Sequence, residues 1–107
     1  MPRPPVQKPQ PLDAATKREQ ERLLLAFGDF LRELRHERLL TIEAVAEAAG
    51  LHANYLGSVE RGERNVSLFN IWRIAAALGV TPGQLMDGVP KSKIKAAIPS
   101  RLASRSA

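Results

Sequence analysis

The sequence predicts a small all-α domain, and three features of its 107 residues favour that fold class. Apolar residues recur at helical spacing, Asp, Ser and Thr stand where helices would begin, and glycines follow several of the helical stretches. No stretch alternates polar and apolar residues with the period of two that marks a half-buried strand. We therefore expect five helices around one modest core, since a chain of this length has room for no more.

The first predicted helix covers residues 13–38, with Asp13 as its N-cap and no proline inside. Residues 14–22 are almost wholly polar, so this part should project into solvent or fray. From residue 23 onward the apolar positions that should face the core are Leu24, Phe27, Leu31 and Leu34. We therefore divide this region into a helical extension, residues 13–26, and the start of the folded domain, residues 27–88.

Four shorter helices should follow, each with its own start and stop signals. These signals are Thr41 and Gly50, His52 and Gly62, Ser67 and Gly79, and finally Thr81 with Pro82 before Gly88. The side chains expected to point inward are Val45, Ala46 and Ala49 on the first of these helices, and Leu68, Ile71, Ala75 and Leu78 on the third.

The two ends of the chain differ in composition from its middle. Residues 1–12 hold five of the eight prolines and should form a disordered arm. Residues 89–107 are rich in Lys, Arg, Ser and Ala and should form a flexible basic tail. The net charge of +5 comes from these ends, because residues 12–90 carry nine basic against eleven acidic side chains. A polyanion contact by the folded part must therefore depend on where its few arginines lie.

Several classes of protein can be set aside. There is no cysteine, and the two histidines, His36 and His52, lack a second cluster of ligands, so we expect no metal and no cofactor. The longest apolar run, residues 23–27, is far too short to cross a membrane, and the start has no apolar signal segment. No Ser, His and Asp are placed as nucleophile and base. We expect a cytoplasmic protein that is not an enzyme.

Two short helices joined by a tight glycine turn form a helix-turn-helix unit. The runs "FGDFLRELRHERLLT", "AVAEAAGL", "YLGSVERGERNVSL" and "RIAAALGVTPGQLM" extend that unit on both sides. Residues 27–88 thus resemble the lambda repressor/Cro-type (XRE) helix-turn-helix domain, which implies a compact five-helix lambda-repressor-like fold, here with an N-terminal helical extension. The run "ERGERNVSL" with Tyr55 is also similar to the controller proteins of restriction–modification systems.

The resemblance implies that residues 52–61 form the recognition helix, which lies in the major groove with its N-terminal residues at base edges. Asn54 is the best single candidate, because an amide can form two hydrogen bonds with adenine. Ala53 could touch only a thymine methyl group, and His52 could donate to guanine or cap the helix. The implied base-contacting residues are His52, Ala53, Asn54, Gly57 and Ser58.

The resemblance also implies contacts to the DNA backbone, made by Thr41, Tyr55, Arg61, Arg64 and Asn65. Three residues depart from the family pattern. Ile42 stands where a glutamine commonly clamps a phosphate, so one anchor should be missing. Leu39 stands where the first helix often ends with glycine, and Phe30 stands where a polar residue is usual.

Two further sets of residues are implied. Glu60 would be repelled by phosphate, and the family pairs its position with that of Arg35, so we expect an ion pair between Arg35 and Glu60.

Phe69, Trp72 and Ala76 form a second apolar stripe on their helix, which then needs a second burial partner. Trp72 could cover the helical extension or Phe30, but we favour a dimer contact through this stripe.

Two functions compete at this stage. The first is a sequence-specific transcriptional regulator, a homodimer on a palindromic operator in double-stranded DNA. The second is an antitoxin or adaptor, whose apolar stripe binds another protein as its partner. The basic tail would either lie along DNA phosphates or simply stay solvated.

Overall fold

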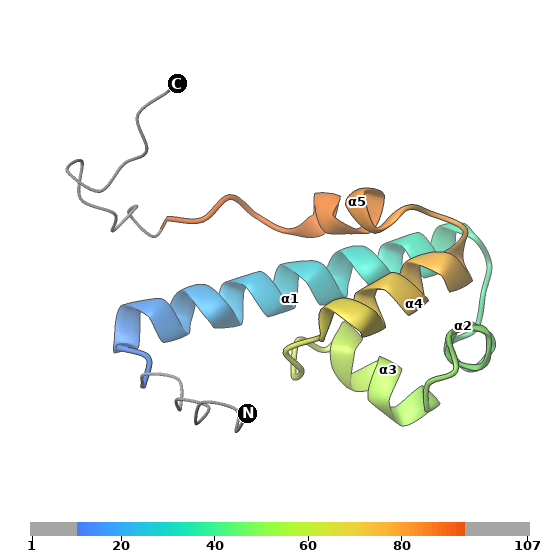
Figure 1. Cartoon of the computed structure of the whole chain (residues 1–107), viewed down its shortest axis with the longest axis horizontal. Coiled ribbons are helices and arrows are strands. Elements are labelled where there is room, and N and C mark those ends of the chain that lie inside the picture. Colours follow the sequence, from blue (N-terminus) through green and yellow to red (C-terminus); the bar gives the residue numbers. More distant parts are fainter. Residues whose placement is uncertain (1–10, 94–107) are drawn as a thin grey trace, which may run out of the picture.

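The longest element of the computed structural model, which describes residues 11–93, is α1 (Ala14–Glu37). Asp13 caps it as predicted, because its carboxylate accepts a 2.7 Å hydrogen bond from the backbone N–H of Thr16. The hydrogen bonds from Thr16 lower the pKa of Asp13. Figure 1 shows α1 running past the other helices, so that the extension and the domain's first helix are one continuous rod. Residues 1–10 of the predicted arm lie outside the described residues.

Four α-helices follow: α2 (Ile42–Ala49), α3 (Ala53–Glu60), α4 (Leu68–Leu78) and α5 (Pro82–Leu85), after which Met86–Gly88 form one 3₁₀ turn. The side chains of Thr41, Ser67 and Thr81 each accept the expected capping bond. Gly50 and Gly79 end their helices in the left-handed conformation, at φ 70° and 72°. The described residues contain these five helices and no strand, so the predicted all-α class is confirmed.

The core forms where α1, α2, α3 and α4 meet, and α5 adds Leu85 to it. Its largest fully buried side chains are Leu31, Val45, Leu56, Val59, Ile74 and Leu85. One predicted core position is wrong, because Leu68 is 81% exposed. Leu68 is the first residue of α4 and lies beyond the edge of the core, whereas Ile74, Ala75 and Leu78 supply the buried face.

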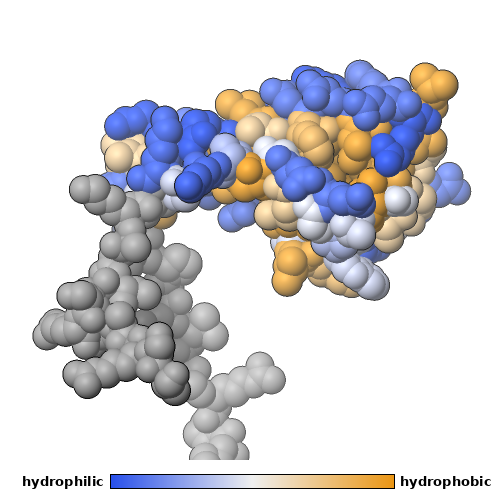
Figure 2. Space-filling model, turned by 90° about the horizontal axis from the view of Figure 1, so that it is seen from above, coloured by the Kyte–Doolittle hydropathy of each residue, from blue (hydrophilic) through white to orange (hydrophobic). Residues whose placement is uncertain are grey.

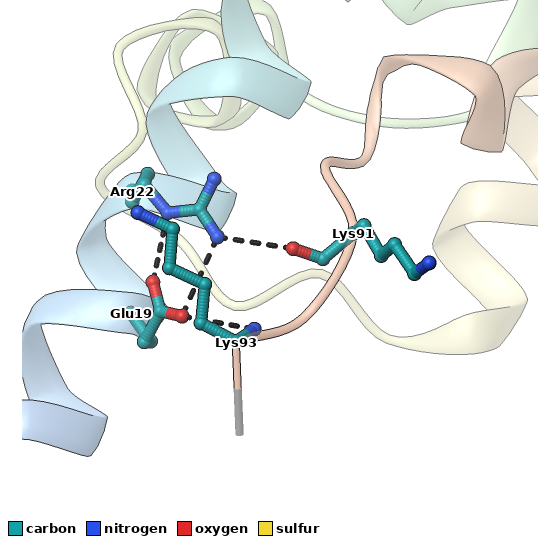
Figure 3. A network of polar contacts seen from close by, with 4 residues as sticks. All are labelled: Glu19, Arg22, Lys91 and Lys93. Carbon is teal, nitrogen blue, oxygen red and sulfur yellow. Dashed lines mark hydrogen bonds and ion pairs between the residues drawn. The ribbon is translucent and has the colours of Figure 1, made fainter. Parts of the chain in front are cut away.

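After α5 the chain turns back and runs along α1 towards its N-terminal end (Figure 1). Arg22 donates a 3.1 Å hydrogen bond to the carbonyl of Lys91, and Glu19 accepts one of 3.1 Å from the backbone N–H of Lys93 (Figure 3). Arg22 also pairs with Glu19 at 2.8 Å, and this hydrogen bond is the main cause of the lowered pKa of Glu19. The sequence assigned residues 89–107 to a flexible tail, but the part up to Lys93 is held against α1; residues 94–107 lie outside the described residues.

Candidate nucleic-acid interface

The N-terminal end of the predicted recognition helix is accessible to solvent. His52 and Asn54 are exposed there and Ala53 is half-buried. The His52 backbone takes the N-cap position, but its side chain makes no capping bond. The sequence left two roles open for His52, and the structure does not show the capping role. Its imidazole is exposed on the surface, where it could donate to a base.

Gly57 and Ser58 do not lie on this exposed face, contrary to our expectation. Ser58 is only 5% exposed; its hydroxyl donates to the carbonyl of Tyr55 at 2.6 Å and accepts from Nε of Arg64 at 3.1 Å. For Ser58 one reason is the loop after α3, which folds back and brings Nε of Arg64 to its hydroxyl. A Cβ on Gly57 would lie 3.2 Å from a guanidinium nitrogen of Arg61 and 3.5 Å from Cδ1 of Ile42. The outward-facing candidates are thus His52, Ala53 and Asn54.

The C-terminal end of α3 is fixed to α1 by the ion pair between Arg35 and Glu60. Nε and Nη2 of Arg35 donate to the two carboxylate oxygens of Glu60 at 2.7 and 2.9 Å, and Nη1 donates to the carbonyl of Leu40 at 3.0 Å. The two side chains are only 12% and 5% exposed. Hydrogen bonding to Glu60 is the main cause that raises the pKa of Arg35. One guanidinium therefore ties together α1, the end of α3 and the loop before α2.

The start of α2, which packs against α3, has backbone N–H groups that lack partners within the helix. Thr41 caps this helix, its hydroxyl accepting from the N–H of Ala44 at 3.1 Å. Ile42, which replaces the glutamine common in the resembling domains, is half-buried and packs against the core instead of facing solvent. The side chain at position 42 thus supplies packing rather than a polar group for DNA.

The loop after α3 carries the predicted phosphate-contacting residues. Arg61 pairs with Glu63 at 2.6 Å, and both side chains are more than half exposed. The hydrogen bond between them raises the pKa of Arg61 and lowers that of Glu63. Asn65 is exposed. Tyr55, on α3 itself, is half-buried, and its hydroxyl accepts a 3.1 Å hydrogen bond from Nδ2 of Asn70.

The fourth helix presents an apolar face away from the core. Phe69 and Trp72 are 60% and 58% exposed, and their rings stack with centres 6.0 Å apart. Ala76 is also exposed. The alternative that Trp72 covers Phe30 is not what the structure shows, because Trp72 stacks on Phe69 and Phe30 packs against Gly88. In Figure 2 hydrophobic patches lie between polar residues over the body of the domain, whereas the surface next to the grey residues is mainly hydrophilic.

Comparison with known proteins agrees with this geometry. A helix-turn-helix family model matches residues 31–85. Control protein C.BamHI of Bacillus amyloliquefaciens is 44% identical over 64 residues, which are 59% of this chain and 79% of that protein. Control protein C.MunI of a Mycoplasma species is 40% identical over 68 residues, which are 63% and 92% of the two chains. The chain belongs to the helix-turn-helix family.

A solved structure supports the same assignment for this helix-turn-helix domain. The restriction–modification controller protein C.AhdI of Aeromonas hydrophila superposes with a TM-score of 0.57 at 50% sequence identity, over 58% of this chain and 94% of that one. The resemblance to XRE-type domains and to controller proteins is therefore confirmed. Together with the exposed start of α3, the family makes this chain a sequence-specific DNA-binding transcriptional regulator.

The helix-turn-helix relatives are regulators and not enzymes. Within residues 11–93, no group of three or more His, Cys, Asp or Glu side chains could hold a metal ion. None of the helices in that range is both long and apolar enough to span a membrane.

Sequence reasoning missed three residues that shape this helix-turn-helix unit. Gly28 lets α1 approach α3 so closely that a Cβ would overlap the carbonyl oxygens of Val59 and Glu60. Asn70 holds Tyr55, and Arg73 bonds the turn between α2 and α3. A glycine inside a strongly helical run was the available signal for the first, since such a glycine is costly unless close packing requires it.

Proposed function

We propose that the protein acts as a homodimer on a palindromic operator, with α3 of each copy in the major groove of one half-site. The observation that carries the dimer is the aromatic pair on α4. Phe69 and Trp72 stack on each other, yet each keeps more than half of its surface in water. Large adjacent aromatic side chains are typical of protein–protein contact surfaces. A second copy would cover them and place two recognition helices on one DNA duplex.

Base reading in this proposal falls to the first turn of α3. Asn54 can form the two-bond contact to adenine, while His52 can donate to guanine and Ala53 can touch a thymine methyl group. Ser58 is not assigned a base contact, because it is only 5% exposed and its hydroxyl proton is already given to the carbonyl of Tyr55. Its hydroxyl instead accepts from Nε of Arg64 and so helps to hold that guanidinium. Gly57 has no side chain with which to read a base, and the nearest neighbour of an added Cβ would be the guanidinium of Arg61.

Contacts to the DNA backbone would flank the reading turn. Arg61, Arg64 and Asn65 lie on the loop after α3, and guanidinium groups suit phosphate oxygens. Tyr55 fits the same role, since Asn70 uses an acceptor site of its hydroxyl and leaves the O–H free to donate. Thr41 marks the start of α2, whose backbone amides and dipole favour an anion.

The relatives favour a more specific role. C.BamHI, C.MunI and C.SmaI are named control proteins, and C.AhdI is described as a restriction–modification controller. We therefore propose that the operator lies beside restriction–modification genes. Because its ligand is DNA, we also propose that the protein works in the cytoplasm, at the nucleoid.

The test is a selection of genomic fragments that the protein binds, followed by footprinting of the fragments that the selection enriches. We expect a protected palindrome whose half-sites are about one helical turn, or a multiple of it, apart. Binding that stays indifferent to sequence in competition with random DNA would end the operator proposal. Fragments that carry palindromes but lie far from any restriction or methyltransferase gene would remove only the controller role.

Sedimentation tests the dimer separately. Trp72→Ser should weaken self-association at least tenfold, because large aromatic residues dominate such contacts. Leu39→Ser is the matched control, since Leu39 is 92% exposed but lies at the turn between α1 and α2. Equal behaviour of the two variants would show that the aromatic face does not hold the dimer.

The antitoxin or adaptor role would gain support if an unrelated protein occupied that face, which co-purification with and without Trp72→Ser would reveal.

A further inference from the structure

Arg73 lies between the aromatic face of α4 and the turn of the helix-turn-helix unit, and it contacts both. Its Nε donates to the carbonyl of Ala49 and its Nη2 to the carbonyl of Gly50, each at 2.7 Å. Ala49 is the last residue of α2 and Gly50 its C-cap, so these carbonyls belong to the end of the helix where backbone acceptors lack helical partners. A cation is favoured there by the helix dipole as well.

The turn is shaped to receive this guanidinium. Gly50 has a φ of 70°, which disfavours any residue with a Cβ, and a Cβ there would also collide with Nη2 of Arg73. Gly79 ends α4 with nearly the same φ of 72°, but a Cβ added to it would meet nothing within 4 Å. Glycine at position 50 thus serves the backbone and also leaves the space that Arg73 occupies.

The guanidinium of Arg73 also lies over the ring of Phe69, one member of the aromatic pair. Its central carbon lies 5.1 Å from the centre of the Phe69 ring, and that ring stacks on Trp72. A cation over an aromatic face is held more strongly when water is removed from the contact. A second copy that covers Phe69 would therefore restrict Arg73 to the position from which it bonds the turn, and that turn aims α3.

We propose that Arg73 is a positioning residue that couples self-association through Phe69 and Trp72 to the placement of the recognition helix. This inference rests on the proposed dimer. It means that DNA binding and dimerisation strengthen each other within each copy, beyond the gain from two half-sites on one duplex. Because such coupling is reciprocal, DNA on a single half-site should tighten the dimer by the factor by which dimerisation tightens half-site binding.

The experiment measures the dimer dissociation constant by sedimentation in two conditions. One uses a saturating duplex of about one helical turn that carries a single half-site of the selected operator, too short for a second subunit to bind. The other uses a scrambled duplex of equal length, which controls for charge. We expect the half-site duplex to tighten the dimer of the unmodified protein about tenfold, within the usual range of coupling between sites.

Arg73→Lys keeps the positive charge but lacks the planar fork that reaches two carbonyls from one group. In this variant the ratio of the two dissociation constants should fall below about twofold. Any direct effect of the substitution on the dimer contact cancels, because it enters both conditions. A ratio that stays at the unmodified value would overturn the proposal, and would direct attention to the bond between Asn70 and Tyr55, which also joins α4 to α3.

A pair of glycine variants gives an independent check. Gly50→Ala and Gly79→Ala impose a similar backbone strain, but only the former displaces Arg73. Gly50→Ala should lose the coupling and Gly79→Ala should keep it, at a temperature where circular dichroism shows both variants to be folded. Equal coupling in the two would refute the role of Arg73, and if Gly50→Ala fails to fold, Arg73→Lys decides alone. A protein that sediments as a monomer in every condition would instead overturn the proposed dimer.

Discussion

Arg35 on α1 holds Glu60 at the end of α3 by two hydrogen bonds of 2.7 and 2.9 Å, with little of either side chain in water. Removing one partner of such a pair leaves the other charge buried without compensation. Because Glu60 ends the recognition helix, the pair bears on the stability of the domain and also on the direction of the reading face.

We expect Glu60→Ala to lower the free energy of unfolding by about 3 kcal/mol, measured by urea denaturation. Asp29→Ala is the control. It breaks the ion pair between Asp29 and Arg32, whose side chains are 60% and 46% exposed, and should cost less than about 0.5 kcal/mol. Similar losses for the two variants would mean that the buried pair contributes no more than a surface pair.

We expect that a substitution at Leu39 can stabilise the protein. Leu39 is the only described non-glycine residue with a positive φ, 55°. Its side chain is 92% exposed, so no packing of that side chain compensates for the backbone strain. Leu39→Gly should raise stability by about 0.5–1 kcal/mol, seen as a higher thermal midpoint, since relief of the left-handed strain outweighs the added entropy of the unfolded chain. Leu39→Ala removes the same exposed side chain but retains the strain, and should show no such gain.

Gly28→Ala should be disruptive although alanine favours helices. A Cβ at position 28 would lie 2.6 Å from the carbonyl oxygen of Val59, and backbone cannot yield as a side-chain tip can. We expect a loss of about 1–3 kcal/mol in unfolding free energy, the usual cost of overpacking. Gly83→Ala is the matched helical control, because its nearest neighbour would be 3.8 Å away. A neutral Gly28→Ala would show that α1 and α3 can separate at no cost.

The helices could be predicted from the sequence because their signals are local. Thr41 and Ser67 cap the N-termini of α2 and α4, and Gly50 and Gly79 end the same two helices. Each of these residues acts on backbone groups within a few residues of its own position. The burial of Ser58 depends instead on the path of the loop that brings Arg64 back over α3, which no local pattern encodes. Likewise, periodicity placed Leu68 on the core face of its helix, but it cannot show that the core ends before the first turn of α4.

Glu63→Gln should strengthen DNA binding without changing specificity, on the proposal that Arg61 contacts phosphate. In the free protein Glu63 holds Arg61 by a 2.6 Å hydrogen bond, and the carboxylate would itself repel the duplex. Affinity for the selected operator and for scrambled DNA should rise by about the same factor, larger at low salt. Glu33→Gln removes an equal charge from the exposed surface of α1. If it raises affinity as much, the gain comes from net charge and not from releasing Arg61.

Asn54→Ala and Arg64→Ala should separate sequence reading from backbone contact. Asn54 is exposed in the first turn of α3, so its loss should relax base choice at one position of each half-site, at about 1–3 kcal/mol of discrimination. Arg64 lies on the loop and its Nε bonds Ser58, which leaves its remaining N–H groups for a phosphate. Its loss should weaken cognate and scrambled DNA alike and reduce the dependence of affinity on salt. Repeating the fragment selection with each variant measures both effects, and the same loss on both kinds of DNA for Asn54→Ala would contradict its place at a base edge.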